Sequence, residues 1–275
     1  MVAKKVLITG ATSGIGYATA KELIRQGTEV YFIARNIERA QAVKAELGAK
    51  GFFIADLSSQ KSIRKAAAEI ETQLPIVDVL INNAGGVATE FILTNDGIER
   101  TIATNHFAYF LLTNLLLENI KKSEYARIVN VSSDSHYRGK IDIESFTQNK
   151  GYFVNTAYAQ SKLANVLFTK ELAKRLSNTH VTVNCLHPGV VDTQIGNKGT
   201  AWYAGAAWKL MTMILGVPLE EGAKTSVYLA SSTDVKGVTG KYFDKCREKK
   251  PSTTSEDAEM QKKLWEVSEQ LCPLG

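Results

Sequence analysis

A short apolar run followed at once by a glycine-rich turn is the feature that most constrains the fold of this chain. Residues Val6 to Ile8 have the continuous hydrophobicity of a strand that is buried on both faces. The following turn, Thr9 to Gly16, reads TGATSGIG and leads into an amphipathic helix. This order predicts a dinucleotide-binding unit, because Gly10, Gly14 and Gly16 permit a tight turn and the helix points free N–H groups at a pyrophosphate. Glycines that only punctuate the chain are the alternative.

Strand and helix patterns then alternate along the chain. We expect further strands at 29–34, 51–54, 76–81, 127–131, 181–186 and 241–243, and helices at 37–47, 59–73, 97–119, 156–176, 219–230 and 256–271. For 275 residues this predicts a single α/β domain, a Rossmann-like doubly wound parallel sheet of about seven strands flanked by helices. Within it we expect a dinucleotide-binding and catalytic core at 1–193, a substrate lid at 194–218 and a tail helix within 250–275.

The end of the second strand bears on the choice of cofactor. An acidic residue normally stands there and accepts hydrogen bonds from the ribose hydroxyls of NAD. This chain has Ala34-Arg35-Asn36 instead. The planar cation of Arg35 can bind a 2′-phosphate, so the sequence favours NADP over NAD. An arginine that caps a surface loop is the alternative.

Polar and small residues follow other expected strands. Asp56 could accept from the adenine amino group or help to cap the helix that Ser58 or Ser59 begins. The amide-rich stretch 82–85 and the turn at Pro188 and Gly189 follow two more strands. Ligands of open α/β sheets bind beyond the carboxyl ends of the strands, so we expect these residues to line a common site.

A tyrosine and a lysine are spaced for acid–base chemistry. If 156–176 is helical, Tyr158 and Lys162 lie one turn apart on the same face. A free phenol has a pKa of about 10, and a nearby cation lowers that pKa toward neutrality. The spacing alone is common enough to arise by chance, so a packed tyrosine with a solvated lysine is the alternative.

Two more polar side chains stand in apolar surroundings. Asn105 is a poor helix former in the middle of the apolar helix expected at 97–119, which calls for a specific reason. Its neighbour His106 is expected to pack or to bond locally. Ser133 follows the strand at 127–131, which places a hydroxyl where the sheet opens.

The remaining composition excludes several classes of protein. The chain has a net charge of +5 with scattered lysines, and we interpret the cluster at 245–250 as a solvated loop and expect no nucleic acid partner. The cysteines are few and widely spaced, which predicts neither disulfides nor a metal site and suits a reducing compartment. They are Cys185, Cys246 and Cys272.

Targeting and membrane signals are not expected. The first strand begins too close to Met1 for a signal peptide, and the most apolar segment, 201–219, is interrupted by Lys209 and Pro218. The sequence therefore predicts a soluble, cytoplasmic protein without a transmembrane segment. The aromatic and methionine-rich stretch 196–216 is interpreted as a mobile apolar lid, with a helix pair that completes the core or touches a membrane surface as the alternative.

These motifs together resemble one family. TGATSGIG at 9–16, NNAG at 82–85, Ser133, Tyr158-x-x-x-Lys162 and Pro188-Gly189 with Thr193 occur in the order found in short-chain dehydrogenases/reductases. The resemblance covers the whole chain. It is strongest to the retinol dehydrogenase and WW-domain oxidoreductase subgroup, through RIVNVSS at 127–133, SKLANVLFT at 161–169 and GKYF at 240–243.

The resemblance implies a catalytic tetrad of Asn105, Ser133, Tyr158 and Lys162. Tyr158 would protonate a carbonyl oxygen as hydride arrives from the nicotinamide, and would act in reverse for alcohol oxidation. Ser133 would hold that oxygen, and Lys162 would bond the nicotinamide ribose and lower the Tyr158 pKa. Asn105 would position a water in a proton relay.

The resemblance also implies NADP(H) as the preferred cofactor and a set of residues around it. Ser13 and Ile15 would line the phosphate turn, Asp56 and Leu57 the adenine, Asn83 a ribose. The complete expected set is Gly10, Ser13, Gly14, Ile15, Gly16, Arg35, Asp56, Leu57, Asn83, Ala84, Gly85, Tyr158, Lys162, Pro188, Gly189, Val191 and Thr193, the last two at the carboxamide.

The function implied is an oxidoreductase that interconverts a lipophilic alcohol and its aldehyde or ketone, like a retinol dehydrogenase or a carbonyl reductase. Relatives pair through the helices that hold Asn105 and Tyr158, which implies a homodimer or homotetramer. Ser13 stands where many NADP-preferring relatives place a base, and the N-terminal membrane segment of many retinol dehydrogenases is not expected here.

Two other functions are weighed on the same fold. A non-catalytic dinucleotide sensor or scaffold would be expected to have a broken tetrad, whereas all four positions are filled here. A sugar-nucleotide epimerase or dehydratase would need a larger C-terminal substrate domain than follows Thr193.

Overall fold

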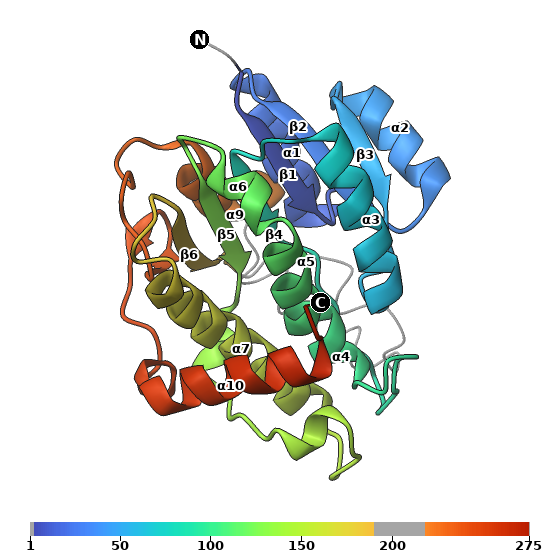
Figure 1. Ribbon diagram of the computed structural model, residues 1–275, viewed down its shortest axis with the longest axis vertical. Coiled ribbons are helices and arrows are strands. Elements are labelled where there is room, and N and C mark those ends of the chain that lie inside the picture. The colour runs from blue at the N-terminus through green and yellow to red at the C-terminus, as the bar shows by residue number, and fades with distance from the viewer. Residues whose placement is uncertain (1–2, 190–217, 275) are drawn as a thin grey trace.

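Within residues 3–189 and 218–274, which the computed structural model describes, eight strands form one central sheet (Figure 1). Its strand order is β3-β2-β1-β4-β5-β6-β7-β8. The strands are β1 (Lys5–Thr9), β2 (Glu29–Ala34), β3 (Gly51–Ile54), β4 (Val79–Asn82), β5 (Arg127–Val131), β6 (Thr182–His187), β7 (Tyr242–Asp244) and β8 (Arg247–Glu248). The doubly wound α/β fold predicted from the sequence is therefore confirmed.

The sheet is parallel throughout except for its last pair, β7 and β8. Side chains alternate between its two faces, as the pleat of a strand requires. In β1, Val6 and Ile8 belong to one core cluster, whereas Leu7 belongs to the cluster on the other face. This explains why the run is apolar at every position.

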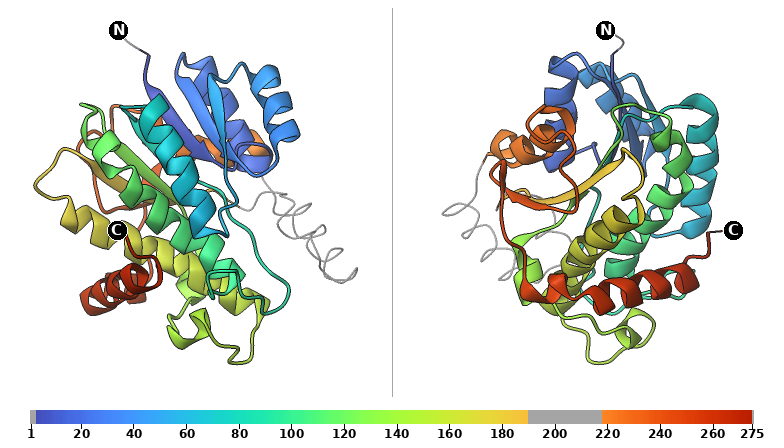
Figure 2. Two further views of the ribbon diagram at one scale, coloured as in Figure 1. Left: turned by 45° about the vertical axis from the view of Figure 1, so that its right-hand side comes forward. Right: turned by 60° about the vertical axis from the view of Figure 1, so that its left-hand side comes forward.

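Helices cover both faces of the sheet (Figure 2). One layer contains α1 (Gly14–Arg25), α2 (Ile37–Leu47) and α9 (Leu219–Ser231). The other contains α3 (Gln60–Gln73), α5 (Ala108–Leu115), α7 (Val154–Arg175) and α10 (Ala258–Leu271). Short 3₁₀ helices, at Asp134–Arg138, Glu144–Phe146 and Thr253–Glu256, lie in the connections.

The prediction of a single long helix at 97–119 is wrong. The segment instead comprises α4 (Arg100–Ile102), a π-helical turn (Ala103–Phe107), α5 and, after a break at Leu116, α6 (Leu117–Lys121). The π turn contains Asn105, whose side chain bonds to the backbone of Gly86 rather than to its own helix. Such turns insert an extra residue into a helix and occur often at functional sites.

The sheet has one strand more than the seven predicted, and the additional strand lies in the lysine cluster. Arg247 and Glu248 pair with β7, so the segment 245–250 is not simply a solvated loop. Lys245 and Cys246 make the intervening turn with left-handed φ angles of 50° and 59°. The polar composition of this strand hid it, because edge strands need no apolar face. Elsewhere, the strands predicted at 76–81, 181–186 and 241–243 are shifted toward later residues by one to three positions.

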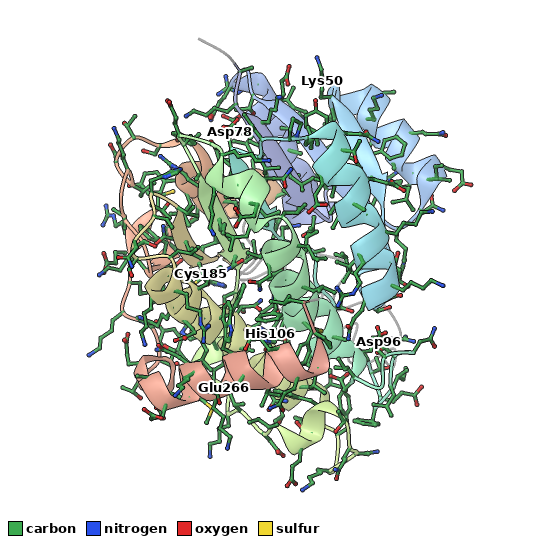
Figure 3. All side chains as sticks on the ribbon, in the orientation of Figure 1. Lys50, Asp78, Asp96, His106, Cys185 and Glu266 are labelled. Atoms are coloured by element: carbon green, nitrogen blue, oxygen red, sulfur yellow. The ribbon has the colours of Figure 1, made fainter. Side chains whose placement is uncertain are left out.

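The predicted tail helix is present and lies across α7 (Figure 1). Its Trp265 ring lies 5.0 Å from the ring of Phe110 and 6.0 Å from that of Phe168. His106, which Figure 3 labels near this helix, packs in the core as expected. Its Nε2 does not bond locally but lies 2.9 Å from Ser268 Oγ on α10. The tail helix is thus part of the core.

Some residues for which the sequence makes predictions lie outside the described residues. Val191, Thr193 and all but Pro218 of the lid expected at 194–218 lie outside them. Among the helices that are described, none combines the length and the apolar character that crossing a bilayer requires. All three cysteines have free thiols.

Candidate active site

The glycine turn between β1 and α1 packs tightly enough to require glycine. Gly10 and Gly14 have φ angles of 72° and 61°, in the left-handed region. A Cβ atom on Gly16 would lie 2.3 Å from the carbonyl oxygen of Gly10 and 2.4 Å from Asn83 Nδ2. The tight turn predicted from the glycines is therefore present.

The start of α1 has the properties of an anion site. Ser13 is the N-cap residue in an extended conformation, and its side chain makes no capping hydrogen bond. The first turn, which begins at Gly14 and includes Ile15, contains no acidic residue. Free backbone N–H groups and the positive end of the helix dipole favour a negative charge here. These features fit the pyrophosphate of a dinucleotide.

The stretch after β4 is joined to the glycine turn by Thr9. The backbone N–H groups of Asn83 and Ala84 both donate to Thr9 Oγ1, each at 2.9 Å. Asn83 Nδ2 donates to the carbonyl oxygen of Thr9 at 2.9 Å. Thr9 was not identified from the sequence, although a threonine that ends a buried strand is a usable signal. The Asn83 side chain, predicted to face a ribose, supports the turn with its amide hydrogens.

Two arginines stand at the edge of the same turn. Arg35 follows β2 directly and is exposed. Arg39, in the first turn of α2, extends back to the glycine turn, and its Nε and Nη2 each lie 3.3 Å from the carbonyl oxygen of Thr12. Arg39 was also missed, and its position in the first turn of the helix that follows Arg35 is the signal that could have revealed it.

The residues after β3 show whether Asp56 caps the helix that follows it. The Asp56 carboxylate accepts hydrogen bonds from the backbone N–H and the hydroxyl of Ser58. Helix α3 is capped by Ser59, which accepts from Ser62 N at 3.3 Å. Asp56 therefore stabilises the local turn and does not cap the helix. Leu57 is partly buried against the core.

Lys162 is buried between α7 and the end of β5, with only 4% of its surface exposed. Its Nζ donates to the carbonyl oxygen of Val131 at 3.1 Å, and its own carbonyl oxygen accepts from Ser132 Oγ at 2.7 Å. Burial lowers the pKa of Lys162 to about 8.

Tyr158 lies one turn earlier on α7 and is partly exposed. Burial raises the pKa of its phenol, and the Ser133 hydroxyl lowers that pKa by a smaller amount. The downward shift expected from Lys162 is therefore not found. Burial disfavours the charged form of Lys162 as well, and its ammonium nitrogen lies 5.6 Å from the centre of the Tyr158 ring.

Ser133 follows β5 and caps a 3₁₀ helix, where its Oγ accepts from Ser135 N at 3.2 Å. The turn that it begins ends at Gly139, where a Cβ atom would lie 2.6 Å from the carbonyl oxygen of Ala159. The turn from Ser133 to Gly139 is called the serine turn below. The absence of a side chain at Gly139 allows it to pack against α7 next to Tyr158.

Asn105 links the π turn to both neighbouring elements. Its Oδ1 accepts from Gly86 N, and its Nδ2 donates to Gly86 O and to Ser161 Oγ, all within 2.9 Å. Ser161 Oγ in turn donates to the carbonyl oxygen of Tyr158 at 2.8 Å. A Cβ atom on Gly85 would lie 3.1 Å from Asn105 Oδ1 and 3.5 Å from Lys162 Nζ. The structure therefore gathers all four residues of the predicted tetrad.

The end of β6 completes the described part of this region. Pro188 and Gly189 follow the strand, and Gly189 has a φ of 87°. They lie at the same edge of the sheet as the residues after β1, β4 and β5, because these strands are parallel.

Comparisons with known proteins agree with this geometry. Residues 4–204 match the sequence profile of the family described as short chain dehydrogenase. Retinol dehydrogenase 14 of Mus musculus is 41% identical over 286 residues, which cover 98% of this chain and 86% of that protein.

Two solved structures extend the likeness to the fold. An uncharacterised protein from Mycobacterium paratuberculosis superposes with a TM-score of 0.78 at 32% identity, covering 98% of this chain and 93% of that one. A short-chain dehydrogenase from Shigella flexneri, complexed with NADP, has a TM-score of 0.66 at 25% identity and covers 89% and 97%. The glycine turn, the gathered tetrad and these likenesses together show that the chain belongs to the short-chain dehydrogenase family.

Proposed function

We propose that the chain is an NADP(H)-dependent oxidoreductase that interconverts a lipophilic alcohol and its aldehyde or ketone, with Tyr158 as the general acid and base. The observation that carries this proposal is the convergence of Tyr158, Ser133 and the buried Lys162 where β5 meets α7. A phenol, a hydroxyl and an ammonium in one place suit proton transfer to a carbonyl oxygen.

The bound nicotinamide supplies or accepts the hydride. In the direction of reduction, the Tyr158 hydroxyl donates its proton to the carbonyl oxygen of the substrate. The Ser133 hydroxyl donates a hydrogen bond to the same oxygen and so stabilises the developing negative charge. In the direction of oxidation, the Tyr158 phenolate accepts the alcohol proton. The raised pKa of Tyr158 keeps it protonated at neutral pH, which suits its role as an acid.

Lys162 stabilises the phenolate that forms when Tyr158 releases its proton. A positive charge acts more strongly in a buried environment than in water, because the local dielectric constant is low. We propose that Lys162 also bonds the nicotinamide ribose and that Asn105 orders a water for proton exchange. The bonds from Asn105 to Gly86 and Ser161 hold the π turn against α7 for this purpose.

The preference for NADP rests on two cations and on a missing carboxylate. We propose that Arg35 and Arg39 bind a 2′-phosphate, since both follow the end of β2 and no acidic residue follows β2 directly. Arginine is suited to bidentate phosphate contacts. The residues proposed to hold the cofactor are Gly10, Ser13, Gly14, Ile15, Gly16, Arg35, Arg39, Asp56, Leu57, Asn83, Ala84, Gly85, Pro188, Gly189, Val191 and Thr193.

The substrate class rests on the relatives. A protein named retinol dehydrogenase 14 is 41% identical to this chain over an alignment that covers most of both lengths. We therefore propose a retinoid or another apolar carbonyl of similar size. A non-catalytic sensor is not favoured, because the tetrad is complete and assembled.

The proposal is tested by following NADPH absorbance with retinal and a panel of aromatic ketones, with Tyr158→Phe alongside. Wild-type turnover with a loss of about a hundredfold or more in Tyr158→Phe, at unchanged NADPH affinity, is expected. Tight NADPH binding without turnover on the whole panel would favour a sensor. Near-wild-type turnover in Tyr158→Phe would refute the role of Tyr158 while leaving the oxidoreductase activity in place.

A further inference from the structure

Two histidines bond the peptide group between Ser133 and Asp134, one at its carbonyl oxygen and one at its N–H. The carbonyl oxygen of Ser133 lies 2.7 Å from His136 Nδ1. The N–H of Asp134 donates to His187 Nδ1 at 3.2 Å. Both imidazoles are buried, with 0% and 9% of their surfaces exposed. The orientation of this peptide sets the direction in which Ser133 carries its hydroxyl.

The partners of His136 leave only one possible proton arrangement. A carbonyl oxygen can only accept, so Nδ1 of His136 must carry a proton and donate it to Ser133. Its Nε2 accepts from the backbone N–H of Ser252 at 3.1 Å, so Nε2 must be unprotonated. His136 is thus a neutral Nδ1–H imidazole. Burial lowers its pKa, which keeps it in this form at neutral pH.

The group that selects this tautomer lies far away in the sequence. Ser252 is buried and directly precedes the 3₁₀ helix that leads to α10. The Tyr137 hydroxyl makes a second bond to the same segment, donating to the carbonyl oxygen of Lys250 at 2.6 Å. Segment 250–252 is therefore bonded to the serine turn at two points.

The surroundings of His136 restrict the motion of its ring. The ring contacts those of Tyr137 and Tyr242, with centroid distances of 4.1 and 4.6 Å. Tyr242 also donates to the Asp134 carboxylate at 2.7 Å, and Lys249 approaches the same carboxylate. A fully buried imidazole with both nitrogens bonded and two aromatic neighbours has little freedom to turn.

We propose that His136 is a positioning residue for Ser133, which it orients through its Nδ1–H bond to the Ser133 carbonyl oxygen, and that the Ser252 N–H selects the tautomer that makes this bond. The inference rests on the proposed function only in that Ser133 must act on the substrate. It adds a connection from the reacting hydroxyl, through one imidazole, to the segment before α10.

Two substitutions separate the two bonds of the ring. His136→Asn places an amide N–H near the position of Nδ1 and preserves the bond to Ser133, but leaves the Ser252 N–H without its acceptor. His136→Gln places a carbonyl oxygen near the position of Nε2 and preserves the opposite bond. His136→Phe removes both bonds and keeps a ring. His180→Asn is the control, because His180 is exposed and bonds Ser123 at the other end of the sheet.

The expected result is a difference in kcat without a difference in cofactor binding. His136→Asn should stay within about threefold of the wild-type kcat, whereas His136→Gln and His136→Phe should lose about tenfold, because both lack the hydrogen bond to the Ser133 carbonyl oxygen. NADPH affinity, from fluorescence, should remain unchanged in all three. Equal losses in all three variants would show a packing role and overturn the proposal, as would full activity in all three or a loss confined to His136→Asn.

One measurement needs no substitution at His136. In the ¹⁵N spectrum of the wild-type protein, the imidazole of His136 should show a protonated Nδ1 and an unprotonated Nε2 at neutral pH. The opposite tautomer would overturn the proposal even if no variant folds. Ser133→Ala, run in parallel, separates the role of Ser133 from that of His136. Full activity in Ser133→Ala would refute the role of Ser133. An inactive Ser133→Ala together with a fully active His136→Gln would refute only the role of His136.

Discussion

The ammonium nitrogen of Lys162 lies 5.6 Å from the centre of the Tyr158 ring, and burial moves the pKa values of the two groups in opposite directions. The pKa of Lys162 falls to about 8, whereas that of Tyr158 rises above its ordinary value. Within this pair, therefore, Lys162 loses its proton first as the pH increases.

This order predicts the pH dependence of carbonyl reduction. Lys162 is charged below a pH of about 8 and neutral above it, so its stabilisation of the Tyr158 phenolate is lost as the pH rises through that value. We expect kcat to fall with an apparent pKa near 8, measured at saturating NADPH between pH 6 and 10. A profile that stays flat to pH 10 would contradict the prediction.

Replacing Lys162 should make the protein more stable while it inactivates the enzyme. A pKa lowered from 10.5 to about 8 means that the folded state disfavours the charge by about 3 kcal/mol below pH 8. The unfolded chain binds the additional proton between these values, so stability rises with pH across that window. After subtracting the lost bond to Val131, Lys162→Met should gain about 2 kcal/mol at pH 7.

Denaturant unfolding at pH 7, with turnover measured on the same preparations, tests this prediction. The matched control is Lys65→Met on the exposed face of α3, which should change neither stability nor turnover appreciably. A Lys162→Met variant that is less stable than the wild type would show that the buried charge is well compensated by its surroundings.

Arg39 should contribute to the discrimination between the two dinucleotides. Its guanidinium lies over the glycine turn, next to the end of β2, so it would act on the 2′-phosphate together with Arg35. Arg39→Ala should weaken NADPH binding about tenfold and leave NADH binding unchanged, as judged by fluorescence titration. Arg35→Asp should shift the preference further toward NADH. Lys44→Ala, exposed on the same helix, is the control, and equal losses for both cofactors in Arg39→Ala would argue for a role in supporting the turn.

Gly16→Ala should separate the loss of cofactor binding from a general loss of stability. Its Cβ would overlap the backbone of Gly10 and the amide of Asn83, which should cost about 1 to 3 kcal/mol and displace the turn. Gly48→Ala meets no neighbouring atoms but is strained by its φ of 71°, at a cost of roughly 1 to 2 kcal/mol. Both variants should therefore melt earlier, whereas NADPH affinity should fall only in Gly16→Ala. Intact NADPH binding in Gly16→Ala would show that the turn is less tightly packed in solution.

The parts of the site that could be predicted from the sequence depend on neighbouring residues. A buried parallel strand is apolar throughout, and the residue after it lies at the edge where ligands bind. Ser133, Asn83 and the glycine turn follow the strands β5, β4 and β1 as expected on this basis, and their roles toward a ligand stay predictions. The helix period likewise placed Tyr158 and Lys162 on one face.

The missed features depend on contacts between distant segments. The π turn at Asn105 is specified by the backbone of Gly86 and by Ser161 on another helix, and no local pattern announces it. The pKa of Tyr158 depends on burial rather than on its spacing from Lys162. The two residues of the short edge strand β8, Arg247 and Glu248, form a strand only because β7 lies beside them.

The position of α10 has a consequence for synthesis on the ribosome. Trp265 and Ser268 complete the layer around Phe110, His106 and Phe168, yet they are translated after every one of those partners. Until α10 emerges, the nascent chain holds that aromatic surface open to water and to chaperones. The first half of the sheet can form while translation continues, but the helix layer that supports Tyr158 closes only near the end of synthesis.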